Sequence, residues 1–252
     1  MEIKHLSFSY GCNPVLEDVS FAVPEGKVTT VLGSNGSGKS TLFYLMTKNL
    51  PLQGGDILLG GRSIREIRLK DFAKRVSIVN QTNTVNGDIT VKKLVGYGRT
   101  PFLSFMRQMS DEDERLIDWA MEITNVKKYQ DREVSTLSGG QRQRVWIAMA
   151  LAQNTKLLLL DEPTTYLDIR YQVQILKLIR RLNREFGMTI VMVLHDMNQA
   201  IHYSDRILGL KDGRIVARGA PQETITPEGI EEIYGIRLEV VQDHNRQFVL
   251  QI

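Results

Sequence analysis

The residues of this chain best suited to bind a phosphate chain lie in one glycine-rich segment with the pattern G-x-x-x-x-G-K-S. It follows the apolar, β-branched run 28–32 and leads into helix-forming residues. Backbone N–H groups at a helix N-terminus bind anions, and glycine lets the backbone approach them closely. We therefore predict a nucleoside triphosphate site in which Lys39 reaches the outer phosphates and the Ser40 hydroxyl holds Mg²⁺. The predicted loop residues are Gly33, Ser34, Asn35, Gly36, Ser37, Gly38, Lys39, Ser40 and Thr41.

Two carboxylates, Asp161 and Glu162, follow directly after the leucine run 157–160. Four consecutive leucines predict a central parallel strand that is buried on both faces. Because a buried charge needs a partner, we expect these carboxylates to act on Mg²⁺ and on a phosphate-bound water. Asp161 would hold the metal through its hydration shell, and Glu162 would orient or deprotonate the attacking water. A helix cap or a surface turn is the alternative, which the buried run disfavours.

Two further polar residues follow predicted strands. Gln81 comes after the run 76–80, and His195 comes after the run 189–194. Ligand chemistry in open α/β sheets gathers beyond the carboxyl ends of the strands. Gln81 is therefore a candidate to contact Mg²⁺ or water, and His195 a candidate to contact a γ-phosphate. Taken alone, a polar loop glutamine and a hydrogen-bonded core or loop histidine are the commoner alternatives.

A second glycine-opened helix start precedes the helix-forming segment 143–154. It suits an anion, although a helix N-cap without a ligand is the commoner meaning of such a sequence. Tyr10 precedes a predicted turn at 11–14, where its ring could stack on a nucleotide base or could equally pack on the sheet. The residues of the second helix start are Ser138, Gly139, Gly140 and Gln141.

Composition limits the class of protein. The 252 residues carry a formal net charge of +3, which suits an anionic ligand but does not by itself indicate nucleic acid. The single cysteine, Cys12, excludes a disulfide framework and favours a reducing compartment. The N-terminal residues lack an apolar run for export, and the aliphatic run 157–160 is far shorter than a membrane span. We expect a chain that crosses no membrane by itself.

The elements that must position these residues follow from hydrophobic periodicity and turn residues. We expect an antiparallel hairpin in 3–23, a second hairpin around 60–61, mostly helix from 83 to 154, and a long helix over 169–186. Thr90, Ser110 and Asp196 can cap helices, and Asp212-Gly213 is typical of a hairpin turn. The tail 221–252 is expected to hold a short helix and a closing strand pair, without chemistry of its own.

In their order and spacing, these motifs resemble those of the ATP-binding-cassette (ABC) ATPases along nearly the whole chain. The resemblance implies an α/β P-loop NTPase (RecA-like) fold with a mostly parallel core sheet, an N-terminal antiparallel β subdomain and an inserted α-helical subdomain. It implies one ABC ATPase domain over 1–252, with the core and β subdomain in 1–82 and 155–220, the helical subdomain in 83–154 and a C-terminal extension in 221–252.

The resemblance also implies roles for the motif residues. Ser138 and Gly140 would bind the γ-phosphate of ATP held by a second copy, so that a homodimer closes on two nucleotides. A helix start that covers the open side of the γ-phosphate suits this role physically. The implied roles are adenine stacking for Tyr10, Walker A for Gly33–Thr41, Q-loop for Gln81, signature for Leu137–Gln141, Walker B for Asp161 and Glu162, D-loop for Tyr166–Asp168 with Asp168, and switch histidine for His195.

Within that family the chain is closer to ATPase subunits of bacterial importers for iron chelates (siderophores), haem and cobalamin. The supporting stretches are 98–101, 137–153, 161–168 and 194–200, whereas Ser34 stands where the family usually has proline. The resemblance implies ATP and Mg²⁺ as cofactors, two transmembrane permease subunits as partners and, indirectly, a substrate-binding protein. It implies a peripheral location on the cytoplasmic face of the bacterial inner membrane.

The alternative is a soluble cassette ATPase that acts in DNA repair or translation. Repair members carry a long coiled-coil insertion between the Q-loop and the signature, but the interval from Gln81 to Ser138 is compact here. Translation members usually carry two cassettes, and this chain has one set of motifs. We therefore expect no nucleic acid partner.

Overall fold

The structure is a computed structural model that describes residues 1–85, 87–103, 109–243 and 246–250. Its strands are β1 (Glu2–Tyr10), β2 (Asn13–Ala22), β3 (Val28–Leu32), β4 (Gly54–Leu59), β5 (Arg62–Ser63), β6 (Val76–Val79), β7 (Leu157–Leu160), β8 (Thr189–Val193), β9 (Arg206–Lys211), β10 (Arg214–Gly219), β11 (Val240–Asp243) and β12 (Arg246–Val249). Its α-helices are α1 (Lys39–Met46), α2 (Leu69–Ala73), α3 (Val91–Gly96), α4 (Asp111–Ile123), α5 (Gly139–Ala152), α6 (Ile169–Phe186), α7 (Met197–Tyr203), α8 (Pro221–Thr224) and α9 (Pro227–Tyr234). Short 3₁₀ helices cover Ile64–Glu66, Tyr97–Phe102, Lys127–Tyr129 and Val134–Thr136. The chain forms two compact units, one of residues 1–67 with 180–252 and one of residues 68–179.

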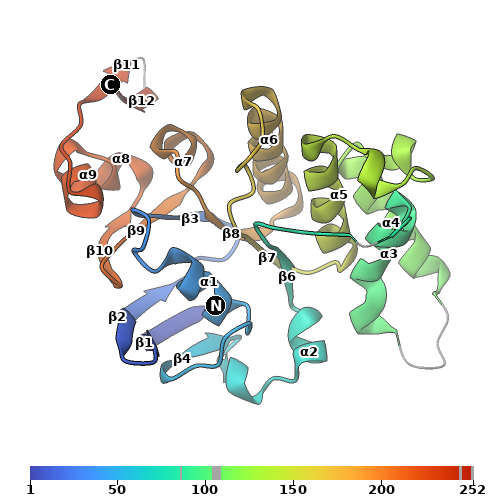
Figure 1. The fold of residues 1–252 in the computed structure, drawn as a ribbon, viewed down its shortest axis with the longest axis horizontal. Coiled ribbons are helices and arrows are strands. Elements are labelled where there is room, and N and C mark those ends of the chain that lie inside the picture. Colours follow the sequence, from blue (N-terminus) through green and yellow to red (C-terminus); the bar gives the residue numbers. More distant parts are fainter. Residues whose placement is uncertain (86, 104–108, 244–245, 251–252) are drawn as a thin grey trace. The chain divides into compact units, whose positions relative to one another are not determined.

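The first unit contains two sheets. β2, β1, β4 and β5 form an antiparallel sheet in that order, which agrees with the hairpins expected from the sequence. β3 pairs in parallel with β8 on one side and with β9 on the other, and β10 returns antiparallel to β9. Every residue of β3 and β8 is buried, as their apolar, β-branched sequences predict. In this unit α7 lies between β8 and β9 in the chain, and α8 and α9 follow β10 (Figure 1).

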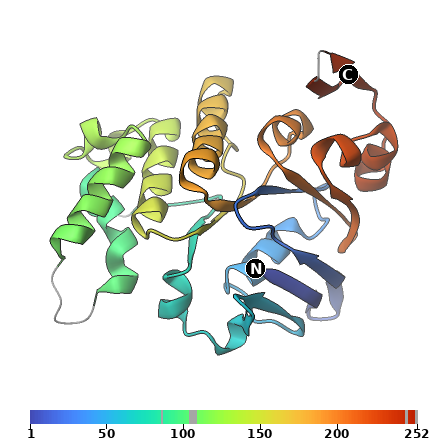
Figure 2. The same cartoon turned by 180° about the vertical axis from the view of Figure 1, so that it is seen from behind.

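The second unit joins a parallel strand pair to a group of helices. β6 pairs in parallel with β7, and the four leucines of β7 are buried as expected. α3, α4 and α5 pack against one another, as the views from both sides show (Figures 1 and 2). Thr90 caps α3, and Ser110 caps α4 in a reciprocal hydrogen-bonded box with Asp113, so the expected caps are confirmed.

The α/β class with a mostly parallel core sheet is therefore confirmed, with two local corrections. The first hairpin turns over Gly11 and Cys12 alone, because Asn13 already pairs with Tyr10 and Pro14 with Ser9. The tail holds two helices, α8 and α9, instead of the single one expected; each begins with a proline at its first turn, where the missing N–H costs no hydrogen bond. The subdomain boundaries inferred from the family resemblance stay a prediction.

Candidate functional site

The glycine-rich segment links β3 to α1 through a loop that requires its glycines. Gly33, Gly36 and Gly38 have φ values of 158°, 80° and 101°, which other residues rarely adopt. A Cβ on Gly33 would lie 2.2 Å from the carbonyl oxygen of Leu210, and a Cβ on Gly38 would lie 2.8 Å from a methyl carbon of Leu16. The loop thus holds its backbone where side chains would not fit, as a phosphate-binding turn must.

Lys39 begins α1 and directs its ammonium group back over this loop. Its side chain is buried, and Nζ donates hydrogen bonds to the carbonyl oxygens of Gly33 at 2.9 Å and Ser34 at 2.8 Å. The next residue, Ser40, is exposed at the first turn of α1, and Thr41 is buried. A cation, a hydroxyl and the N–H groups of a helix start therefore belong to one short segment, and these are the groups that a triphosphate with its metal requires.

His195 lies at the same edge of the sheet as the loop. β3 and β8 are parallel with Val31 opposite Val193, so Gly33 and His195 leave the sheet at the same level. The His195 residue is exposed, and Asp196 caps α7 by accepting a hydrogen bond from the backbone N–H of Gln199 at 2.9 Å. The structure thus gives His195 the position expected from the sequence, and its contact with a γ-phosphate stays a prediction.

Tyr10 ends β1 at the turn of the first hairpin. Its residue is 49 % exposed, and its ring meets Phe8 edge to face with 5.0 Å between the ring centroids. The backbone of β2 approaches the phosphate loop nearby, since a Cβ on Gly38 would lie 2.9 Å from the carbonyl oxygen of Val15. About half of the Tyr10 surface is thus exposed, which agrees with either role considered for it.

The second unit brings Gln81 and Glu162 together. β6 and β7 end level with each other, and the N–H of Asp161 donates to the carbonyl oxygen of Val79 at 2.9 Å. Gln81 Nε2 donates a hydrogen bond to Glu162 Oε2 at 2.6 Å. Asp161 is buried, and Glu162 has a φ of 46°, a left-handed conformation that is rare outside glycine and is concentrated at functional sites.

Thr165 is a member of this cluster that the sequence did not single out. Its hydroxyl donates to the same Oε2 atom of Glu162 at 2.9 Å. The carboxylate is therefore held by two donors, an amide and a hydroxyl, which fix its direction. A hydroxyl three residues after a candidate base was the signal that could have identified Thr165.

The second helix start packs closely on the start of α6. Ser138 caps α5 in a reciprocal hydrogen-bonded box with Gln141, so the N-cap expected there is present. A Cβ on Gly140 would lie 2.2 Å from the ring of Tyr171, so only glycine fits. Asp168 accepts a hydrogen bond from the N–H of Tyr171 at 3.1 Å, and therefore serves the start of α6.

Gln141 has a partner that sequence spacing could not indicate. Its Nε2 donates to the phenol oxygen of Tyr129 at 3.0 Å. Tyr129 lies in a 3₁₀ turn after α4, and nothing in the local pattern connects it to the glycine-opened helix.

Comparison with known proteins identifies the arrangement. A family model described as "ABC transporter" matches residues 16–165. The chain belongs to the ABC transporter family. It is 44 % identical over 243 residues to the "Iron(3+)-hydroxamate import ATP-binding protein FhuC" of Bacillus subtilis, covering 96 % of this chain and 90 % of the relative. It is also 44 % identical to the "Ferric enterobactin transport ATP-binding protein FepC" of Escherichia coli, covering 95 % and 89 %.

Solved structures of ABC proteins agree with this assignment. A metal-chelate type ABC transporter in an inward-facing conformation matches with a TM-score of 0.84 and 27 % identity, over 98 % of this chain and 94 % of that chain. The dimeric cassette MJ0796 bound to ADP and Pi matches with a TM-score of 0.74 and 27 % identity, over 87 % and 98 %. This ABC protein is thus a nucleotide-binding ATP hydrolase, and the comparisons do not favour the DNA-repair alternative. Among its described residues, no helix is long and apolar enough to span a membrane.

Proposed function

We propose that this chain is the ATP-hydrolysing subunit of an importer that takes up a metal chelate of the ferric siderophore, haem or cobalamin class. The observation that carries the proposal is the match to iron-hydroxamate and enterobactin import proteins over at least 95 % of the chain. Such an ATPase does not touch the cargo itself, so separate transmembrane subunits would carry the chelate.

Each unit, taken by itself, contains oxygen donors that suit magnesium. Among the described residues, no group of three or more His, Cys, Asp or Glu side chains could hold a metal ion on its own. Mg²⁺ in nucleotide sites needs no such group, because it keeps waters and phosphate oxygens and takes only one or two protein ligands. The exposed Ser40 hydroxyl, the buried Asp161 carboxylate and the Gln81 amide provide oxygen donors of the right kind. Bound Mg²⁺ would supply charge neutralisation on the phosphates.

The chain's own residues account for hydrolysis. The loop N–H groups and Lys39 would bind the phosphates, with Lys39 exchanging its two carbonyl acceptors for phosphate oxygens. Glu162, held by Gln81 and Thr165, would orient a water in line with the γ-phosphorus. The water oxygen forms a bond to phosphorus as the bond to the β,γ-bridging oxygen breaks, and ADP, Pi and a proton are released. His195 would donate a hydrogen bond to the γ-phosphate.

Two copies of the chain would form the working unit. The cap Ser138 and the buried Gly140 would cover the γ-phosphate of ATP held by the second copy, with the helix start of α5 stabilising its charge. The pair would bind two permease subunits, and through them a substrate-binding protein. This assembly would place the ATPase peripherally on the cytoplasmic face of the bacterial inner membrane.

Coexpression with candidate permeases tests the proposal. The complex is purified in detergent, and ATP hydrolysis is measured with and without a substrate-binding protein loaded with its ferric siderophore. We expect copurification and stimulation by the loaded protein, and loss of turnover with retained ATP binding in the Glu162→Gln variant. A rate that loaded binding proteins leave unchanged, together with a salt-sensitive shift on duplex DNA or ribosomes, would favour the soluble alternative instead.

A further inference from the structure

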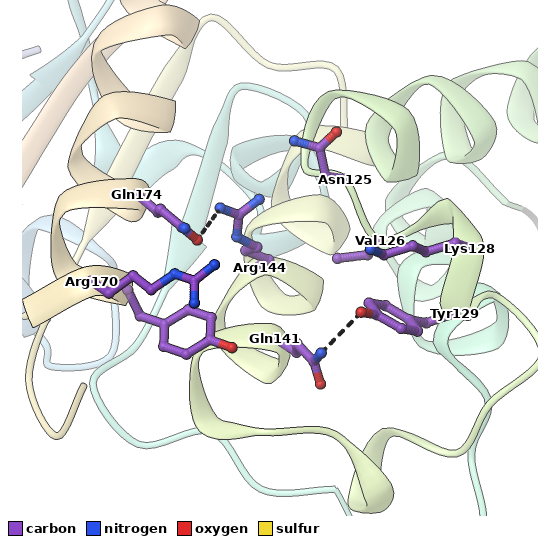
Figure 3. A pocket seen from close by; sticks show the side chains of 9 residues that line it. Asn125, Val126, Lys128, Tyr129, Gln141, Arg144, Arg170 and Gln174 are labelled. Carbon is purple, nitrogen blue, oxygen red and sulfur yellow. Dashed lines mark hydrogen bonds between the residues drawn. The ribbon is translucent and has the colours of Figure 1, made fainter. Parts of the chain in front are cut away.

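A polar cavity lies beside the second helix start, within the unit of residues 68–179. Its volume is about 220 Å³, and it opens between the segment 125–129, the start of α5 and the start of α6 (Figure 3). The side chains that decide its chemistry are Lys128, Tyr129, Gln141, Arg144, Arg170 and Tyr171. Of the second helix start, Gln141 lines the cavity, whereas Ser138, Gly139 and Gly140 do not.

The charges around this cavity are of one sign. Lys128, Arg144 and Arg170 are cationic, and no carboxylate belongs to the residues that line it. Lys128 and Arg170 are exposed, and neither forms an ion pair with any described residue. Lys128 instead lies over the ring of Tyr129, 5.0 Å from the ring centroid. Three cationic residues therefore line this cavity, and none of its lining residues is a carboxylate.

Arg144 is partly buried, and both of its hydrogen-bond acceptors are uncharged. Its Nη1 donates to the carbonyl oxygen of Thr124 at 3.1 Å and its Nη2 to Gln174 Oε1 at 2.8 Å, and both acceptors are neutral. Burial lowers the pKa of the Arg144 guanidinium, and the phenols of Tyr171 and Tyr129 oppose this shift. A partly desolvated cation without a counter-charge gains free energy from a bound anion.

We propose that this cavity binds an oxyanion of the phosphate class. Its volume lies below the roughly 300 Å³ at which pockets for drug-sized ligands begin, so a tetrahedral ion fits the space better than a nucleotide. Three cations match an ion that carries nearly two negative charges, and two guanidinium groups suit paired hydrogen bonds to its oxygens. The tyrosine hydroxyls and the side-chain amides supply further donors.

Binding there would act on the second helix start. Gln141 lines the cavity and is hydrogen-bonded to Tyr129, which lines it as well. Tyr171 lines the cavity too, and its ring is the group that excludes a side chain at Gly140. An anion that fixes Tyr129 and Tyr171 would therefore fix Gln141 and the glycine beside it. Neither the binding nor this effect requires ATP hydrolysis, so the inference can fail while the proposed function stands.

The probe is inorganic phosphate, titrated into the full chain without nucleotide. We use the Lys39→Ala background, so that the phosphate loop competes less, and hold ionic strength constant with potassium chloride. Backbone amide resonances of Gln141, Arg144 and Tyr171 are followed by NMR. We expect saturable shifts with a dissociation constant in the millimolar range, and at least tenfold weaker binding in a Lys128→Ala/Arg170→Ala variant, whose exposed substitutions leave the fold intact.

The matched control is Lys177→Ala, which removes an exposed cation from α6 that does not line the cavity. Its titration should be indistinguishable from that of the Lys39→Ala parent. The proposal is overturned if the three resonances do not saturate by 50 mM phosphate, or if chloride alone shifts them equally. It is also overturned if the double variant titrates like the control, since the ion would then not be held by these cations.

Discussion

The buried ion pair between Arg99 and Asp113 offers the sharpest test of how the helical unit is held together. Arg99 Nε donates to Asp113 Oδ1 at 2.8 Å, and the side chains are 6 % and 4 % exposed. Arg99 Nη1 also donates to the carbonyl oxygen of Ala152 at 2.8 Å, at the end of α5. Asp113 in turn accepts from the N–H and the hydroxyl of Ser110. One carboxylate thus joins the start of α4 to the end of α5 through an arginine.

The expected cost of Asp113→Asn follows from these contacts. Burial raises the pKa of Asp113, but hydrogen bonds from Ser110 and the charge and hydrogen bond of Arg99 outweigh it and lower the pKa from 3.8 to about 2. The difference corresponds to about 2 kcal/mol of unfolding free energy at neutral pH. The variant also leaves Arg99 buried without its counter-charge, and losing one partner of a buried pair costs about 3–5 kcal/mol in total. We predict a loss of about 3 kcal/mol at pH 7.

The pH dependence has a definite sign. Because the folded pKa lies below the unfolded value, the contribution of Asp113 is complete above about pH 4 and is lost as the pH falls towards 2. The wild-type advantage over Asp113→Asn should therefore shrink by about 1 kcal/mol between pH 7 and pH 3. Urea unfolding followed by tryptophan fluorescence measures this, because Trp119 in α4 and Trp146 in α5 are the protein's two tryptophans.

Asp111→Asn is the matched control, since it removes the same charge from an exposed position in the same first helical turn. It should cost no more than about 1 kcal/mol, the value of a favourable charge at a helix N-terminus. A loss at Asp113 as small as at Asp111, or a loss that does not change between pH 7 and pH 3, would refute the ion-pair argument.

Three further predictions address the site and the core. Thr165→Val removes a hydrogen bond to Glu162 Oε2. In a phosphate-release assay we expect kcat to fall about tenfold while KM for ATP stays unchanged. A change in KM alone would contradict a positioning role. Gly140→Ala forces a Cβ to 2.2 Å from the ring of Tyr171. We expect this substitution, introduced into the Glu162→Gln variant, to abolish the ATP-dependent dimer that size-exclusion chromatography detects. An unchanged dimer yield would contradict the prediction. Asp205→Asn removes the negative charge and replaces one of the two oxygens that accept guanidinium hydrogen bonds from Arg180 at 2.8 and 2.9 Å. We therefore expect about 2 kcal/mol lower stability in thermal unfolding. A melting temperature within 1 °C of wild type would count against this.

Features that depend on neighbouring residues could be predicted from the sequence. The phosphate loop, the leucine strand β7, and the caps at Thr90, Ser110 and Asp196 are local patterns, because each needs only a few consecutive residues. His195 could be placed for a related reason, since two parallel strands of known direction end at one edge of a sheet.

Features that depend on contacts across the chain could not be predicted. Gln81 and Glu162 are separated by 81 residues, and the left-handed conformation of Glu162 has no sequence signature. The error at Pro14 has a physical cause: proline usually marks a turn, but β2 is the edge strand of its sheet, where a missing N–H is tolerated. The residue type at position 14 favoured a turn, but the edge position of β2 allows this proline to lie within the strand.

The charges of the proposed site residues give a physical reason why the proposed function would require a divalent cation. Lys39 and the loop N–H groups attract phosphates, whereas Asp161 and Glu162 repel them. Two carboxylates that act on a triphosphate would weaken its binding unless positive charge lies between them and the phosphates. Under the proposed function Mg²⁺ would supply that charge, and the buried Asp161 carboxylate would be one of the groups that hold it. Glu162 would keep the hydrogen bonds from Gln81 and Thr165, which hold its carboxylate in a fixed direction toward a water.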